Sequence, residues 1–189
     1  MTHEDSMGNK TVIRAGDVQR MSAGTGLTHS EFNLAQTPVN FYQIWIFPDQ
    51  RGLEPSYDQK SFSKGSWRNT LLPIASGQGI EETVTFYTAA TIYRCDLKKN
   101  KNVVHMATEG RRILLYVTKG EVNANGTTVS EKYQARIDID EPLKLSARES
   151  AEFILINVPS CKGWGYSADT LKGKSKKTHE PPRVFRRPG

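Results

Sequence analysis

The chain has 189 residues, 37% of them hydrophobic, and a formal net charge of +6. It contains no run of about 18 apolar residues, which excludes an ordinary membrane-spanning helix, and its polar first residues are unlike a secretory signal. Two cysteines, Cys95 and Cys161, are too few for a disulfide framework, so we expect a cytoplasmic protein.

The positive charge is concentrated at the C-terminal end. Residues 170–189 contain seven lysines and arginines against Glu180 alone, so the remainder of the chain is neutral overall. A basic segment rich in Pro and Gly is usually solvated, and we expect residues 161–189 to form a basic, disordered tail. Because the remainder is neutral, the basic tail alone suggests nucleic-acid binding, and only weakly.

Short β-prone runs separated by turn residues dominate the first part of the chain. Three such runs come first, at 11–14, 17–21 and 27–32. Residues 39–47 are aromatic or β-branched on both faces, which predicts a strand covered on both sides. Residues 50–67 are polar and lack a sustained periodicity, so we expect an ordered linker there.

A second series of strand signals follows the linker. These runs lie at 71–75, 84–87, 91–97, 103–106, 113–117, 121–122, 127–129, 135–139, 143–145 and 153–158. Asn125-Gly126 is the dipeptide of a type I′ turn and predicts a hairpin. Helical periodicity is not sustained anywhere, and Cys95 falls within a strand pattern. The sequence therefore predicts an all-β fold of short strands in barrels or sandwiches.

His29 and Glu31 lie two residues apart on the third run. Side chains on a strand alternate between faces, so both should point the same way. An imidazole and a carboxylate on one inner face would form half of a site for divalent iron, manganese, nickel or copper. Spacing alone leaves a second interpretation open, in which both are partly exposed strand residues.

Several linked motifs carry a family resemblance. They are the segments His3-Glu4-Asp5-Ser6-Met7-Gly8-Asn9, Ile13 to Gln19, Ser22 to Gly26, His29-Ser30-Glu31, Gln43 to Ile46 and Glu54 to Tyr57. In this order they resemble the pirin family of bicupins. The resemblance implies two cupin barrels, the first binding a metal through three histidines and a glutamate. It also implies metal-dependent dioxygenation of flavonols such as quercetin and, in some members, transcriptional co-regulation.

The chain departs from the family pattern at the metal ligands. By resemblance, His29 and Glu31 occupy the third and fourth ligand positions, while the family's upstream His-x-His element is absent from this sequence. His3, His105 and His179 match no ligand position. We therefore expect weak or no binding of a divalent metal, iron first and nickel, copper or manganese as alternatives, because two protein ligands are too few.

The resemblance and the strand pattern together predict four segments. Residues 1–49 would be the C-terminal part of a metal-type cupin whose opening strands are missing, 50–67 a linker, 68–160 a non-metal cupin, and 161–189 the tail. An open barrel edge would need a second copy or a protein partner to cover it. Two functions stay open: a relative of metal-dependent quercetin 2,3-dioxygenases with an incomplete site, or a non-catalytic regulatory member that binds a protein.

Overall fold

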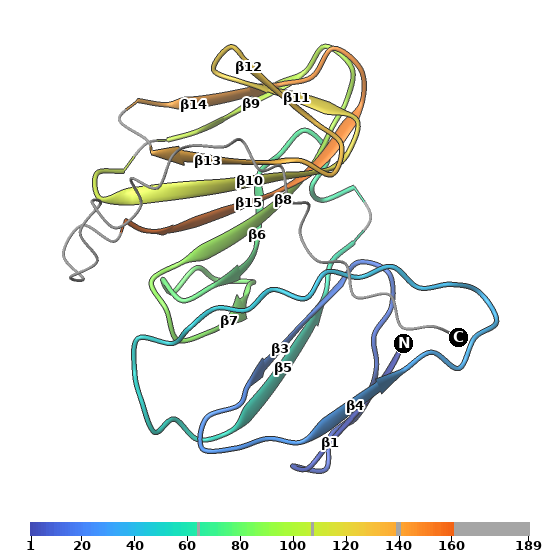
Figure 1. Cartoon of the computed structure of the whole chain (residues 1–189). Coiled ribbons are helices and arrows are strands. Elements are labelled where there is room, and N and C mark those ends of the chain that lie inside the picture. Colours follow the sequence, from blue (N-terminus) through green and yellow to red (C-terminus); the bar gives the residue numbers. More distant parts are fainter. Residues whose placement is uncertain (64, 107, 139–140, 161–189) are drawn as a thin grey trace, which may run out of the picture.

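The computed structural model describes residues 1–63, 65–106, 108–138 and 141–160, and within them the chain consists of strands and turns (Figure 1). No helix in this part of the chain is long and apolar enough to cross a bilayer. The expected all-β class is confirmed. The expected tail at 161–189, with Cys161 and His179, lies outside the described residues.

The N-terminal unit is built from two small antiparallel sheets. Its strands are β1 (Thr2–Asp5), β2 (Lys10–Val12), β3 (Asp17–Ser22), β4 (His29–Phe32) and β5 (Ser56–Ser61). One sheet has the order β2-β1-β4, and the other pairs β3 with β5. The two sheets face each other across the interior of this unit (Figure 1).

The C-terminal unit is a sandwich of a six-stranded and a four-stranded sheet. Its strands are β6 (Leu72–Ser76), β7 (Val84–Thr85), β8 (Thr91–Leu97), β9 (Asn102–His105), β10 (Arg111–Lys119), β11 (Glu121–Ala124), β12 (Thr127–Ser130), β13 (Gln134–Asp138), β14 (Leu143–Ser146) and β15 (Ala151–Pro159). The larger sheet has the order β13-β10-β15-β8-β6-β7 and the smaller β12-β11-β14-β9. Each strand predicted after the linker is present, with small shifts of its ends.

The core of the C-terminal unit lies between these two sheets. Ile113, Leu115 and Val117 on β10 are fully buried and alternate with less buried neighbours, and Phe153 and Leu155 do the same on β15. This period of two is what a strand buried on one main face requires. Cys95 on β8 belongs to the same core, and its predicted position within a strand is confirmed.

The hairpin predicted at Asn125-Gly126 is confirmed. Strands β11 and β12 pair directly across it, with Ala124 opposite Thr127. Asn125 and Gly126 both have positive φ, 44° and 93°, which is the conformation of a type I′ turn.

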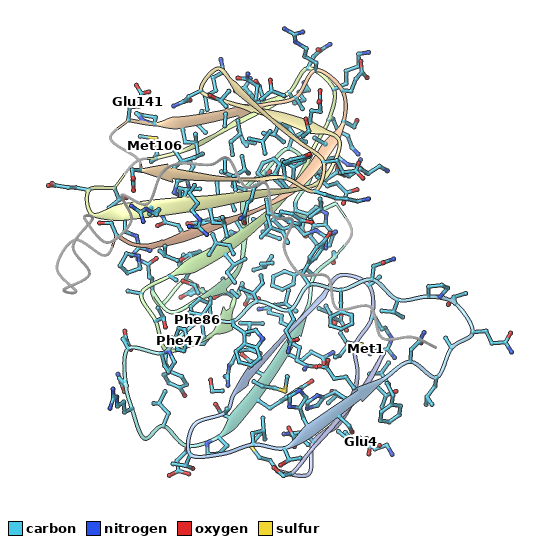
Figure 2. All side chains as sticks on the ribbon, viewed as in Figure 1. Met1, Glu4, Phe47, Phe86, Met106 and Glu141 are labelled. Atoms are coloured by element: carbon cyan, nitrogen blue, oxygen red, sulfur yellow. The ribbon has the colours of Figure 1, made fainter. Side chains whose placement is uncertain are left out.

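The strand predicted at residues 39–47 is wrong. No described strand pairs with this segment, so its backbone follows an irregular path. Tyr42 packs edge-on against Tyr116 at 5.7 Å between ring centroids, and Ile46 packs on the apolar cluster around Val84. Trp45 and Phe47, by contrast, are 83% and 88% exposed (Figure 2 labels Phe47). The apolar pattern of this segment reflects the packing of some of its side chains. It does not make a strand, because a strand also needs a neighbouring strand for its backbone N–H and C=O groups.

Two strands of the N-terminal unit were not predicted from the sequence. Strand β5 lies within the segment expected to be a linker, and β1 lies at the polar start of the chain. Both are rich in polar residues, since the interior that they face is itself polar. The segment boundaries at 49, 67 and 160 stay predictions.

The two units contact each other through apolar packing and hydrogen bonds. Val18 and Phe62 pack against the cluster that contains Val84. Arg20 donates from Nε to the carbonyl oxygen of Thr85 at 2.8 Å, and Lys60 forms an ion pair with Glu82. The β3–β5 sheet therefore rests directly on the edge of the six-stranded sheet.

Asp17 joins the start of β3 to the end of β5. Its carboxylate accepts hydrogen bonds from Ser61 Oγ at 2.7 Å, the Arg14 backbone N–H at 2.8 Å and Gln59 Nε2 at 3.0 Å. Partial burial alone would raise the pKa of Asp17, but these hydrogen bonds outweigh it and lower the pKa below its ordinary value of 3.8.

We expect Asp17→Asn to lower stability more at about pH 7 than at about pH 3. Because the folded-state pKa is lowered, the stabilisation from the carboxylate is complete above 3.8 and is lost as pH falls through the folded-state pKa. Urea unfolding of both proteins at the two pH values measures the difference. An equal loss at both values would show that the charge of Asp17 contributes nothing.

Candidate functional site

The register of β1 with β4 gathers four polar side chains. His3 lies opposite Glu31, and Asp5 lies opposite His29. Directly opposed residues, and residues two apart on one strand, share a face of the sheet. His3 accordingly contacts both neighbours, with its ring 5.8 Å from that of His29 and its Nδ1 3.8 Å from Glu31 Oε1. His29 and Glu31 therefore lie on one face, as their spacing predicted.

His3 is the buried centre of this group. Its side chain is 0% exposed and stacks on Tyr57, with 4.9 Å between ring centroids. Nε2 lies 3.2 Å from Asp5 Oδ2, and Nδ1 lies 3.4 Å from Gln19 Nε2. Since an ionised carboxylate only accepts hydrogen bonds, Nε2 carries the proton and Nδ1 is the acceptor. His3 thus has both ring nitrogens engaged.

The carboxylate of Asp5 is fully committed to local donors. It accepts hydrogen bonds from the backbone N–H groups of Met7 and Asn9, each at 3.0 Å, and from Asn9 Nδ2 at 2.8 Å. Burial would raise the pKa of Asp5, but these bonds and the one from His3 lower it to about 2. Asp5 therefore closes the β1–β2 turn and orients His3.

Gln19 and Tyr57 complete the polar interior from the facing sheet. Gln19 Nε2 donates to Glu31 Oε1 at 3.0 Å, and the Tyr57 hydroxyl lies 3.3 Å from Gln19 Oε1. The same hydroxyl donates to Gln59 Oε1 and contacts Thr11 Oγ1, each at 2.6 Å. Burial, the main cause, raises the pKa of Tyr57, so the phenol stays neutral and able to donate. One network thus connects both sheets.

These residues do not form a complete metal site. Within the described part of the chain, no three His, Cys, Asp or Glu side chains are placed to hold one ion. Asp5 is saturated by N–H donors and His3 is engaged at both nitrogens, which leaves His29 and Glu31 as donors. Divalent ions of this type need more preorganised protein ligands than two.

The remaining histidine and cysteine candidates lie elsewhere. His105 belongs to the C-terminal unit, and His179 lies outside the described residues. Cys95 is buried, and burial raises the pKa of its thiol to about 12, so it is not a thiolate ligand at neutral pH.

Sequence reasoning missed His3 as a member of the site. Its signal was the spacing of His3 and Asp5, which repeats that of His29 and Glu31. The pairing of β1 with β4, which gives this spacing its meaning, was not predicted because both strands are polar.

Comparison with known proteins identifies relatives of both units. The pirin family model matches residues 1–46, and the model of the quercetinase C-terminal cupin domain matches residues 73–158. Quercetin 2,3-dioxygenase of Escherichia coli (strain K12) is 34% identical over 158 residues, which are 83% of this chain and 67% of the relative. A pirin-like protein of Caulobacter vibrioides is 33% identical over 158 residues, 83% of this chain and 68% of the relative.

Solved structures show the same relationship. The crystal structure of YhhW from Escherichia coli superposes with a TM-score of 0.78 at 33% identity and covers 84% of this chain and 67% of its own. The bacterial pirin YhhW in complex with nickel(II) gives a TM-score of 0.77 at 32% identity and covers 84% of this chain and 68% of its own. The chain thus spans about two thirds of the length of these relatives.

We expect Gln19→Leu to destabilise the protein by about 1 to 3 kcal/mol, because it removes the amide that donates to Glu31 Oε1 and to His3 Nδ1 in the polar interior. Chemical denaturation measures the change, and Gln134→Leu, at an exposed position on β13, is the matched control. A cost for Gln19→Leu no larger than that of the control would mean that the network contributes nothing to stability.

Proposed function

Because this chain belongs to the pirin family of cupin proteins, we propose that its N-terminal unit carries part of a pirin-type divalent-metal site, made of His29 and Glu31. By the family resemblance these residues occupy two of four ligand positions. The nickel(II) complex of the bacterial pirin YhhW supports a divalent ion, and iron is the alternative metal. The chain is accordingly a relative of metal-dependent quercetin 2,3-dioxygenases, with a flavonol as the substrate class.

The observation that carries this proposal is that the polar side chains of β1 and β4 differ in how far their hydrogen-bonding atoms are already engaged. His29 and Glu31 on β4 keep donor capacity, whereas Asp5 and His3 on β1 are committed to hydrogen bonds within the protein. Gln19 holds Glu31 Oε1 and so orients the carboxylate. The described part of the chain therefore supplies two anchors for an ion, which is too few to retain a metal through repeated substrate exchange.

We expect this chain to bind nickel(II) or iron(II) weakly and to consume quercetin no faster than the metal alone. Isothermal titration measures the binding, and loss of the quercetin absorbance measures the turnover. His29→Ala should abolish the weak metal binding, because it leaves a single anchor. Ser30→Ala, which changes the neighbouring residue on the opposite face of β4, should leave metal binding unchanged.

A second experiment adds the missing ligands and tests for a gain of quercetin turnover. Fusing an N-terminal segment that bears His-x-His to this chain should produce quercetin turnover that His29→Ala removes. Rapid turnover by the 189-residue chain alone, sensitive to His29→Ala, would overturn the proposal, since it would require ligands that we have not assigned.

A second candidate function, non-catalytic protein binding, is favoured by the exposed aromatic residues of segment 39–47. Trp45 and Phe47 present most of their surface to solvent, and large exposed aromatic side chains close together are typical of interaction surfaces. The opposite side of the segment is held by Ile46 and Tyr42, so these aromatic groups are presented on a fixed support.

We expect the chain to associate with a second copy through this segment, and the double substitution Trp45→Ser with Phe47→Ser to yield a monomer. Light scattering across a concentration series measures the mass. Met7→Ser, which removes an exposed side chain from the β1–β2 turn, is the control and should associate like the unaltered chain. A monomeric, cooperatively unfolding unaltered chain would exclude self-association through these residues.

A further inference from the structure

The C-terminal unit contains an open cavity of about 550 Å³ at one end of the sandwich. Its polar lining comes from segments that the sequence separates widely, with the side chains Gln78, His105, Thr108, Arg111 and Asn157. Met106, at its rim, lies at the far end of the molecule from Glu4 of the N-terminal unit (Figure 2). This volume is typical of pockets for small molecules, and the cavity shares no residue with the site on β4.

Arg111 places a cation in this cavity among neutral acceptors. Its guanidinium donates to Asn157 Oδ1 at 2.7 Å, the Ala89 carbonyl oxygen at 2.6 Å, and Gln78 Oε1 at 3.2 Å. A further bond of 3.1 Å reaches the carbonyl oxygen of Asn157. Among the described residues no carboxylate forms an ion pair with Arg111. Burial lowers the pKa of Arg111, but a guanidinium stays charged in proteins.

Asn157 fixes the state of His105. Because Asn157 Oδ1 accepts from Arg111, its Nδ2 group faces His105 Nε2, at 3.0 Å. That nitrogen must accept the hydrogen bond, so His105 is neutral with its proton on Nδ1. Burial, the larger cause, and the charge of Arg111 both lower the pKa of His105. Among the described residues, Arg111 is therefore the single charged side chain of the lining.

The rest of the lining is aromatic and apolar. The ring of Tyr93 packs edge-on against His105, with 5.3 Å between centroids and an angle of 69° between planes. Burial, its main cause, raises the pKa of Tyr93, so the phenol is neutral at physiological pH. Leu71 and Ile80 add apolar surface. A flat ring with one acidic group matches this combination of walls and charge.

We propose that this cavity binds a small aromatic carboxylate, with the carboxylate on Arg111 and the ring beside Tyr93. A single cation matches a monoanion, whereas a phosphate dianion would call for further donors of positive charge. The hydrogen bonds from Arg111 to Asn157 and Gln78 hold the guanidinium in place before a ligand arrives, so little ordering is needed on binding.

The test uses the full chain without added metal, so its outcome is independent of the function proposed for the N-terminal unit. Benzoate is titrated by calorimetry, with benzamide as the neutral analogue of the same shape and inorganic phosphate as a second anion. Backbone amide shifts in NMR locate the binding. We expect saturable benzoate binding at least tenfold tighter than that of benzamide or phosphate, with shifts at Tyr93, His105 and Arg111.

Two variants of neighbouring arginines separate a built site from surface charge. Arg111→Gln keeps hydrogen-bonding capacity but removes the charge, and we expect it to weaken benzoate binding at least tenfold. Arg112→Gln removes the next arginine, which forms a bidentate pair with Asp138 on the exposed side of β10, and should leave benzoate binding unchanged.

Val104→Trp provides a variant that does not alter the buried polar network. Val104 lies half-exposed at the cavity, so a larger side chain there should block entry without disturbing the core. Near-UV circular dichroism confirms that each variant is folded. The proposal is overturned if benzoate does not bind saturably, or if benzamide or phosphate binds as tightly. It is also overturned if Arg112→Gln weakens benzoate binding as much as Arg111→Gln does, or if Val104→Trp leaves benzoate binding unchanged.

Discussion

The alternation of side chains along β10 and β15 is the constraint on which both units depend. One face of these central strands buries Ile113, Leu115 and Phe153 in the sandwich, while the other face turns Ile154 and Ile156 toward the N-terminal unit. The six-stranded sheet therefore has two apolar faces and must be covered on both. The four-stranded sheet covers the first apolar face, and β3, β5 and segment 39–47 contribute to covering the second. The second face therefore gives the polar N-terminal unit an apolar surface against which it packs.

The N-terminal unit contrasts with the sandwich because its interior is held by hydrogen bonds. His3 lies between Asp5, Gln19 and Tyr57, where a core residue of the C-terminal unit would meet aliphatic side chains. Buried polar groups are stable only when each has a partner, and within the described residues no buried side-chain nitrogen or oxygen lacks one. The same requirement that stabilises this interior engages His3 and Asp5, and so limits the donors available to a metal.

The two sites have opposite electrostatic character. Glu31 and Asp5 bring negative charge to the face that carries His29, whereas Arg111 brings a positive charge to the cavity of the sandwich, where burial is the larger cause that lowers the pKa of His105. A cation is therefore favoured in the first unit and an anion in the second. In both, an amide side chain, Gln19 or Asn157, sets the orientation of its charged neighbour, because an amide can donate from one end and accept at the other.

The sequence by itself determined the fold class, the strands of the C-terminal unit, the hairpin at Asn125 and the shared face of His29 and Glu31. These features follow from local properties: apolar alternation, turn chemistry and the period of a strand. Tertiary structure alone decided that residues 39–47 form no strand, that polar β1 and β5 do, that His3 lies at the centre of the first site, and that Arg111 meets Asn157. Each of these depends on pairing partners distant in sequence, since backbone partners and polar contacts, unlike a pattern of apolar residues, exist only once the chain has folded.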